Sequence, residues 1–179
     1  MEKDILKVLI DEATLKARVA ELGKALEKEY AGKDLMVVGV LKGCMFFLAD
    51  LVREINLPLT MDFMVVSSYG NSTKSSGIVR IIKDLERDIQ GKDVLIVEDI
   101  VDTGLTLSYL IEVLKGRNPN SVKVVSLLDK PSRRKVDVEV EHIGFSVPDE
   151  FVCGYGLDYD EVYRNLPFVC ILKPEVYTK

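Results

Sequence analysis

A buried strand, an acidic turn and a helix follow one another in the middle of this chain. Residues 94–106 read Val-Leu-Ile-Val-Glu-Asp-Ile-Val-Asp-Thr-Gly-Leu-Thr. The first four have the length and the β-branched content of a strand buried in a parallel sheet. After Gly104 the apolar residues follow helical spacing, and Gly116 suits the cap of that helix. The turn therefore lies between the carboxyl end of a strand and the amino end of a helix, where open α/β sheets bind ligands.

The acidic turn carries groups that suit both a phosphate and a sugar. Amides and hydroxyls from Thr103 to Thr106 can bind a phosphate monoester at the start of the helix. The carboxylates of Glu98 and Asp99 would repel that phosphate unless they bind ribose hydroxyls or a hard cation. The combination predicts a phosphoribosyl site. Two alternatives are an acidic surface loop capped by Thr103 and a metal-dependent phosphotransfer site of another kind.

Length and composition restrict the class of protein. With 179 residues, 47% hydrophobic and 30% charged, the chain fits one soluble globular domain, residues 1–179. A net charge of −5 argues against a dedicated nucleic-acid partner. The chain has no signal-like start and no apolar run of membrane length, so we expect a cytoplasmic protein without a membrane partner.

Cysteine and histidine usage excludes several kinds of site. The three cysteines, Cys44, Cys153 and Cys170, have no metal-ligand spacing and are expected in the core of a protein from a reducing compartment. His142 is the only histidine, which argues against a Ser-His-Asp triad and against a histidine-rich zinc site.

Hydrophobic periodicity predicts alternating helices and strands. Helices are expected from the Asp11 cap to about Gly32, over 45–55 and from 107 onward. Strands are expected at 35–41, 60–66, 78–82, 94–97, 122–128, 136–143 and 168–172, with a polar loop at 67–77. This alternation predicts an α/β fold in which helices cover both faces of a mostly parallel sheet.

The acidic turn resembles the phosphoribosyl-pyrophosphate signature of the type I phosphoribosyltransferases. Five other segments narrow the resemblance to the short, bacterial type of the hypoxanthine-guanine branch: Leu41-Lys42-Gly43, 67–70, 126–130, 151–159 and 163–167. They occur in the family's order and span nearly the whole chain from about residue 35. The resemblance implies a type I phosphoribosyltransferase fold, a mostly parallel sheet flanked by helices, with a small hood built from C-terminal segments.

The resemblance also implies a reaction, which is purine salvage. The expected substrates are phosphoribosyl pyrophosphate and a 6-oxopurine base, hypoxanthine or guanine, and the products are IMP or GMP and pyrophosphate. N9 of the purine would displace pyrophosphate from C1 of the ribose through an oxocarbenium-like transition state. By resemblance, Asp102 is the general base at the purine N7. Its reference pKa of roughly 4 leaves it ionised at neutral pH, so no histidine is required.

Further roles follow from the same resemblance. Glu98 and Asp99 would hold the ribose hydroxyls and the associated Mg²⁺, the one cofactor that we expect. Leu105 stands where some relatives carry a basic residue. This departure should matter little, because the phosphate is held mainly by backbone amides.

Three residues are expected at the pyrophosphate. Lys42 and Gly43 follow the first buried strand, and in the family this pair binds pyrophosphate, often beside a non-proline cis peptide. Arg164 matches the pyrophosphate-binding arginine, whose planar fork suits phosphate. Taken alone, these residues would be an exposed strand-to-helix turn and a surface salt bridge.

Four residues are expected at the base. Lys130 resembles the lysine that donates to the purine 6-oxo group, Phe151 the stacking aromatic, and Val152 a source of backbone hydrogen bonds. Asp158 would close the site near the base and bind a second Mg²⁺. The ordinary alternatives are a solvated strand end for Lys130 and a core aromatic for Phe151. Arg133, Arg134 and Lys135 are expected to be a solvated edge.

The polar loop is expected to be a lid over the reacting ribose, with Ser68 and Tyr69 at the closed contact. A mobile hairpin connection is the alternative.

Two rival functions remain open at this point. The preferred base can be xanthine or another 6-oxopurine, or the chain can be a phosphoribosyltransferase-like regulator that binds RNA. The regulator requires a strong basic face, and residues 130–135 are the one short basic run that the chain offers. By resemblance, the enzyme is a homodimer or homotetramer.

Overall fold

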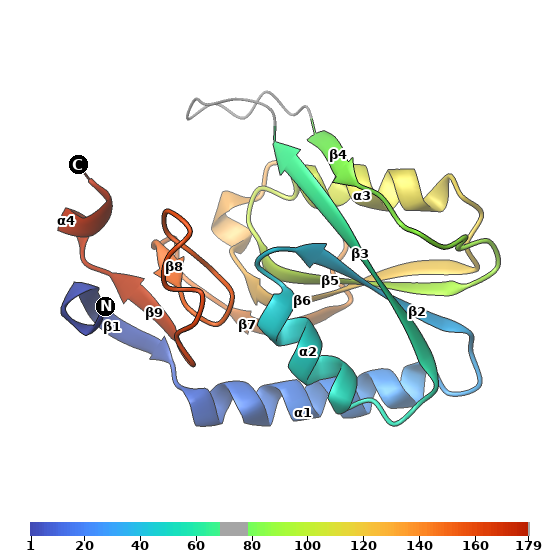
Figure 1. Ribbon diagram of the computed structural model, residues 1–179, viewed down its shortest axis with the longest axis horizontal. Helices are drawn as coiled ribbons and strands as arrows, with labels where there is room; N and C mark the ends of the chain where they lie inside the picture. The colour runs from blue at the N-terminus through green and yellow to red at the C-terminus, as the bar shows by residue number, and fades with distance from the viewer. Residues whose placement is uncertain (69–78, 179) are drawn as a thin grey trace.

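The structure is a computed structural model, and it describes residues 1–68 and 79–178. Within that part of the chain lies a six-stranded sheet of order β4-β3-β2-β5-β6-β7 (Figure 1). Its pairs are parallel except for β3 with β4, which confirms the predicted mostly parallel sheet. The strands are β2 (Leu35–Leu41), β3 (Leu59–Ser68), β4 (Val79–Lys83), β5 (Asp93–Val101), β6 (Ser121–Asp129) and β7 (His142–Ser146).

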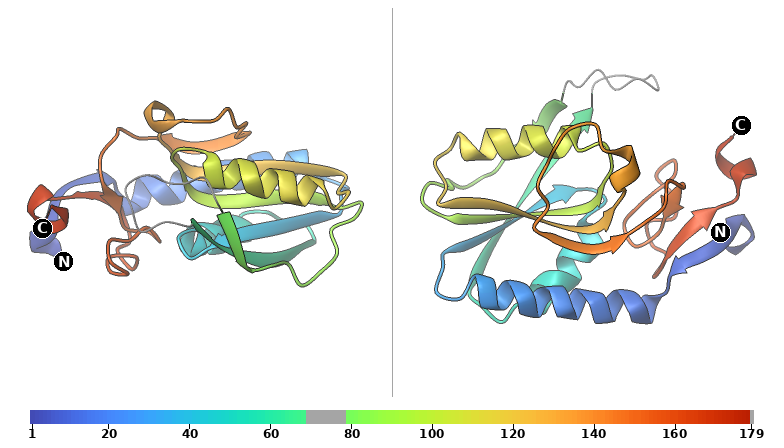
Figure 2. Two further views of the ribbon diagram at one scale, coloured as in Figure 1. Left: turned by 90° about the horizontal axis from the view of Figure 1, so that it is seen from above. Right: turned by 180° about the vertical axis from the view of Figure 1, so that it is seen from behind.

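Helices cover both faces of this sheet, as predicted (Figure 2). Alternate residues of a strand point to opposite faces. In β5, Leu95 and Val97 pack with α1 (Glu12–Glu29) and α2 (Met45–Arg53). Their neighbours Val94 and Ile96 pack with α3 (Leu105–Lys115) on the other face. Two layers of side chains therefore bury β5 and hold its carboxyl end in place.

A second, three-stranded sheet forms the hood, which lies beside the core (Figure 1). Its antiparallel strands are β1 (Ile5–Ile10), β9 (Val169–Leu172) and β8 (Val152–Cys153), in that order. The short helices η1 (Glu2–Asp4) and α4 (Pro174–Tyr177) flank them. The prediction of a hood built only from C-terminal segments is therefore incomplete, because the N-terminal strand β1 is one of its edges.

Helix ends agree with the predicted caps. Asp11 caps α1, where its carboxylate accepts a hydrogen bond of 2.7 Å from the Thr14 amide. Gly116 is the C-cap of α3. The three cysteines are free and buried, as expected of core residues. In the described part of the chain, no helix is long and apolar enough to span a membrane.

The predicted strand at 136–143 is wrong, because β7 begins only at His142. Val138 and Val140 do partly bury their side chains, but they pack against the α3 face of the core. The Val124 amide of β6 donates to the Glu141 carboxylate at 2.8 Å. The Glu141 side chain thus accepts the hydrogen bond that a backbone carbonyl of a strand at 136–141 would have accepted.

Candidate active site

The acidic pair lies inside β5 and not in the turn that was predicted. β5 continues to Val101, so Glu98 and Asp99 belong to the strand. Its pairing with β2 stops at Val97, whereas its pairing with β6 continues to Val101. The last residues of β5 therefore have no β2 neighbour, which leaves room for other segments beside Asp99.

Glu98 is buried and Asp99 is half-buried, which disfavours ionisation of both carboxylates. Burial, together with the charge of Asp99, raises the pKa of Glu98 well above its ordinary value. Burial also raises the pKa of Asp99 to about 6, although the amide of Ile100 donates to its carboxylate. A positive group placed beside this pair would offset both effects.

The turn from β5 into α3 forms a small cavity of about 110 Å³. Gly104 has a φ of 82° and precedes α3 without a capping side chain, so the first-turn amides of this helix receive no cap from it. A Cβ at Gly104 would also press on Val138, at 2.9 Å. The cavity is lined by Glu98, Ile100, Val101, Asp102, Thr103, Gly104, Thr106 and Leu107, five of which are predicted site residues.

Asp102 is held by the segment that follows β6. Its side chain is 40% exposed, so a substrate can reach it, and Nε of Arg133 lies 2.8 Å from its Oδ1. Arg134 donates to the Asp102 carbonyl at 3.0 Å, and the Lys135 amide donates to Thr103 at 2.9 Å. Arg134 also pairs with buried Asp129. The prediction of a solvated edge is therefore wrong for Arg134, which fastens the acidic turn.

The Lys42-Gly43 turn lies against the acidic pair and the hood. The Leu41–Lys42 peptide bond is cis. A Cβ on Gly43 would overlap the Asp99 carboxylate, and a Cβ on Gly156, whose φ is +107°, would overlap the Gly43 carbonyl. Two glycines thus allow three distant segments to meet at the end of the sheet.

Lys42 and Arg164 share one carboxylate, that of Glu161. Nζ of Lys42 lies 2.8 Å from Oε2 of Glu161, and Nη2 of Arg164 lies 3.2 Å from Oε1. Arg164 also pairs with Asp158 at 2.8 Å and donates to the Gly156 carbonyl at 2.8 Å. The structure therefore brings the predicted pyrophosphate residues together. Glu161 was missed, and its only signal was an acid between two predicted residues.

Lys130 is linked to Phe151 through Glu150, the residue that directly precedes Phe151. Lys130 is 8% exposed, and its ammonium donates to the Glu150 carbonyl at 2.6 Å. Burial lowers the pKa of Lys130, while Asp102 and Asp149 act in the opposite direction. Phe151 is 38% exposed, and Val152 of β8 pairs with Ile171 of β9. Neither Lys130 as a solvated end nor Phe151 as an ordinary core aromatic describes these surroundings.

The acidic residues fit a magnesium ion that also has ligands from a substrate. Among the described residues, no three His, Cys, Asp or Glu side chains form a metal-binding group. Asp158 is thus not gathered with Glu98 and Asp99, and its oxygens bind Arg164 and the Glu161 amide. Mg²⁺ is usually bound by one or two carboxylates, substrate phosphates and water, so Glu98 and Asp99 suffice as its protein ligands.

Ser68 ends β3, and Tyr69 with the rest of the predicted lid lies outside the described residues.

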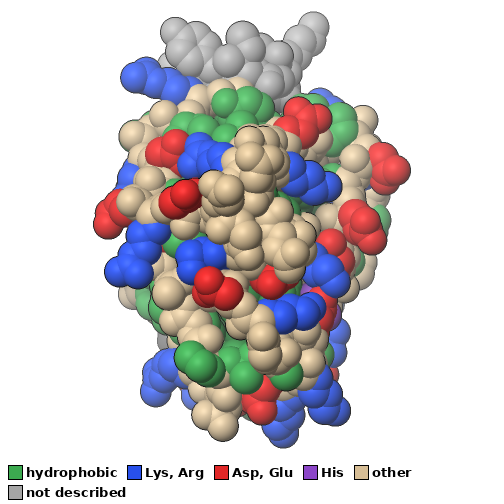
Figure 3. Space-filling model, turned by 90° about the vertical axis from the view of Figure 1, so that its right-hand side faces the viewer, with side chains coloured by type: hydrophobic (Ala, Val, Ile, Leu, Met, Phe, Trp, Pro, Cys, Tyr) green, Lys and Arg blue, Asp and Glu red, His purple; other side chains and the backbone are tan. Residues whose placement is uncertain are grey.

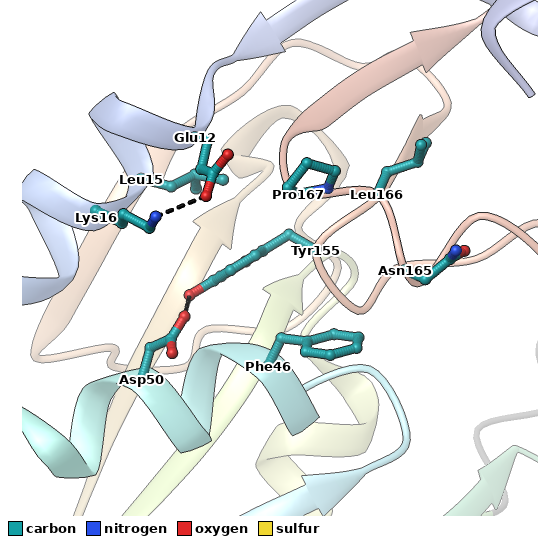
Figure 4. A pocket seen from close by; sticks show the side chains of 9 residues that line it. All are labelled: Glu12, Leu15, Lys16, Phe46, Asp50, Tyr155, Asn165, Leu166 and Pro167. Carbon is teal, nitrogen blue, oxygen red and sulfur yellow. Dashed lines mark hydrogen bonds and ion pairs between the residues drawn. The ribbon is translucent and has the colours of Figure 1, made fainter.

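A larger cavity, of about 220 Å³, lies between the hood, α1 and α2 (Figure 4). The Tyr155 hydroxyl crosses from the hood and donates to Asp50 of α2 at 2.5 Å. Phe46 and Pro167 form apolar walls (Figure 4). None of the predicted site residues lines it. The hydrogen bond from Tyr155 to Asp50 beside this cavity anchors the hood to the core.

Charges are mixed on the face of the molecule opposite the hood. Figure 3 shows lysine and arginine side chains interspersed with acidic ones there. An RNA-binding regulator would need a continuous basic surface. The described residues on this face form none.

Comparison with known proteins agrees with this geometry. The family model for the phosphoribosyl transferase domain matches residues 9–160. The hypoxanthine-guanine phosphoribosyltransferase of Bacillus subtilis (strain 168) is 56% identical over 177 residues, which are 99% of this chain and 98% of that protein. A crystal structure of a hypoxanthine phosphoribosyltransferase from Staphylococcus aureus matches with a TM-score of 0.97 at 52% identity, covering 100% of this chain and 97% of that one.

One group of relatives is much longer than this chain. The bifunctional protein TilS/HprT of Listeria monocytogenes (strain F2365) is 56% identical over 179 residues, which are 100% of this chain and 28% of that protein. The chain therefore spans less than a third of the length of that relative. By its family model, its full-length relatives and its fold, the chain belongs to the phosphoribosyltransferase family, in the group of the hypoxanthine-guanine phosphoribosyltransferases.

Proposed function

We propose that the chain transfers the phosphoribosyl group of phosphoribosyl pyrophosphate to N9 of hypoxanthine or guanine and releases pyrophosphate. The observation that carries this proposal is the meeting of three distant segments at one end of the sheet. Gly43 lies against Asp99, and Gly156 lies against Gly43. Lys42 directly precedes Gly43, Arg164 donates to the Gly156 carbonyl, and Glu98, next to Asp99, lines the cavity at the turn. The curated relatives of similar length, which carry the name hypoxanthine-guanine phosphoribosyltransferase, support the same choice.

An assay with four bases tests the proposal directly. With phosphoribosyl pyrophosphate and Mg²⁺, we expect turnover of hypoxanthine and guanine, and little of adenine. A marked preference for xanthine would support the first rival. No turnover of any base, together with RNA binding, would support the regulator. Residence in the cytoplasm and assembly as a homodimer or homotetramer remain predictions.

The proposed chemistry assigns a task to each group. N9 forms a bond to C1 of the ribose as the bond from C1 to the pyrophosphate oxygen breaks. The purine loses its N7 proton to the Asp102 carboxylate in the same process. Arg133, 2.8 Å from Oδ1, orients that carboxylate. Lys42 and Arg164 would take up the negative charge that grows on the leaving pyrophosphate.

Glu98 and Asp99 would hold the ribose hydroxyls and the magnesium ion. When it is bound, Mg²⁺ supplies positive charge that stabilises the departing pyrophosphate. The chain's own contribution is this pair of carboxylates, one buried and one half-buried, whose pKa values are raised by burial. The amides of the turn and of the first turn of α3 would bind the 5′-phosphate.

We expect activity to vanish in excess chelator and to return when Mg²⁺ is added. The reason is that oxygen ligands favour a hard cation, and this chain has no His/Cys set for zinc. The measurement is initial rate against free Mg²⁺, with Zn²⁺ as the control metal. Full activity in excess chelator would contradict this part of the proposal.

The lysine that selects the base gives a further prediction. Lys130→Met should remove a charged donor from the 6-oxo group, at a cost of about 1.5–3 kcal/mol. The kcat/KM with hypoxanthine and guanine should therefore fall roughly ten- to a hundredfold. The ratio of adenine to hypoxanthine use should rise, because adenine lacks that oxygen.

The matched control is Lys135→Met, which removes an exposed lysine from the same segment. It should leave the ratio of adenine to hypoxanthine use unchanged. If Lys130→Met lowered the use of both bases equally, the lysine would act in folding of the site and not in base selection.

A further inference from the structure

We propose that Tyr177 is a positioning residue for the purine, because its ring backs Phe151 and leaves the opposite face of Phe151 to the base. This inference rests on the proposed function, in which Phe151 stacks on the purine. It assigns a role in base binding to the C-terminal helix α4, which carries none of the predicted site residues.

The ring of Phe151 contacts two other aromatic rings. Its centroid lies 5.1 Å from that of Tyr177, with an angle of 23° between the planes, which is a stacked arrangement. The ring of Tyr159 meets it edge-on, at 5.6 Å and 88°. Despite these neighbours, 38% of Phe151 is exposed. Tyr177 therefore covers one face, Tyr159 contacts the ring edge-on, and the face opposite Tyr177 is the surface that a flat base can use.

The backbone alone does little to hold Phe151. The residue precedes β8, which begins at Val152, so no strand pairing holds it. A phenylalanine side chain in such a position can turn among its staggered rotamers unless neighbours restrict it. The stacked ring of Tyr177 is such a neighbour. It would keep the Phe151 ring in the orientation that a stacking base requires.

Tyr177 is itself fixed by both ends of the chain. The Lys173 amide, directly before α4, donates to the Asp4 carbonyl at 2.9 Å. The hydroxyl of Tyr163 donates to the Asp4 carboxylate at 3.2 Å. Val176 and Tyr177 pack against the buried residues of the hood. Helix α4 is thus a packed part of the hood, and its tyrosine can restrain another ring.

The inference predicts an effect that is confined to the base. Stacked aromatic pairs contribute an amount of binding free energy that corresponds to roughly two- to tenfold in affinity. Tyr177→Ala should raise KM for hypoxanthine and guanine by about that factor. KM for phosphoribosyl pyrophosphate and kcat at saturation should remain within about twofold. The reason is that the ion pairs of Lys42, Arg164 and Asp102 do not involve Tyr177.

The experiment compares three variants of the full chain. Tyr177→Ala removes the ring, Tyr177→Leu keeps much of the volume without a ring, and Tyr177→Phe keeps the ring without its hydroxyl. We expect the first two to weaken base binding and Tyr177→Phe to retain the wild-type values. Calorimetric titration with GMP and with pyrophosphate should give weaker GMP binding and unchanged pyrophosphate binding for the first two variants.

Three results would overturn the inference. Unchanged KM for the bases in Tyr177→Ala would remove Tyr177 from base binding, and a lower KM would mean that its ring competes with the base. Equal changes in the KM values for base and phosphoribosyl pyrophosphate would indicate general damage, and Tyr177→Leu guards against misfolding as the cause. If instead the wild-type chain turned over no purine and bound no GMP, the proposed function itself would have failed.

Discussion

Asp102→Asn is expected to lower kcat by ~10²–10⁴-fold, the range typical of a lost general acid–base group. Asparagine keeps the size of the side chain but cannot accept the purine N7 proton. Binding of phosphoribosyl pyrophosphate should change much less, because backbone amides and other carboxylates would hold it. Turnover at saturating substrates, together with a separate binding titration, checks both expectations.

Asp149→Asn is the matched control for this variant. Asp149 is the second acid that faces Arg133, at 3.3 Å, and it is exposed. Its loss would disturb the same arginine without removing the proposed base, so we expect activity within a few-fold of the wild type. Wild-type turnover in Asp102→Asn would exclude Asp102 as the base.

Gly43→Ala is expected to lower kcat/KM by roughly a hundredfold, the loss that a misplacement of about 1 Å can cause. The added methyl would overlap the Asp99 carboxylate, which is half-buried and accepts a hydrogen bond from the Ile100 amide. Either Asp99 or the Lys42-Gly43 turn must shift, and both belong to the candidate site. Steady-state kinetics with guanine measures the loss, and thermal unfolding reports whether the fold survives.

The control is Gly116→Ala, at the end of α3. Gly116 has an ordinary φ of −64°, and a Cβ there would meet nothing closer than 3.5 Å. This variant should keep wild-type kinetics. If Gly43→Ala also kept kcat/KM within threefold of the wild type, the close approach of Gly43 to Asp99 would have no part in activity.

Local signals were sufficient for most strands of the core sheet and for the connection from β5 to α3. The buried run at 35–41 coincides with β2, and the caps at Asp11 and Gly116 are where short-range patterns predicted them. These features depend on neighbours along the chain, so the sequence pattern contains them. The site residues around the turn followed from family resemblance, and the structure brings Lys42, Asp99 and Arg164 to one place.

The features that were missed depend on partners far away in the sequence. β1 exists because β9 pairs with it, and its own burial pattern has no clear alternation. The valines around 138 looked like a strand, but they pack on α3 without a ladder partner. Arg134 was expected at a solvated edge and Glu161 was not predicted to have a role. Only the fold reveals that Arg134 pairs with Asp129 and Glu161 with Lys42. Periodicity cannot report such contacts.

The edge position of β1 has a consequence for how the molecule is made. β1 neighbours only β9 in its sheet, and β9 comes after every strand of the core sheet. During synthesis β1 therefore leaves the ribosome before the strands of the core sheet, and its partner β9 leaves after them. The core sheet can pack while β1 is still unpaired. Leu6 and Val8 of β1 remain exposed even in the complete fold. The hood, which would cover the base, is thus completed after the core sheet. A nascent chain stalled before β9 would carry the turn from β5 into α3 without an assembled hood.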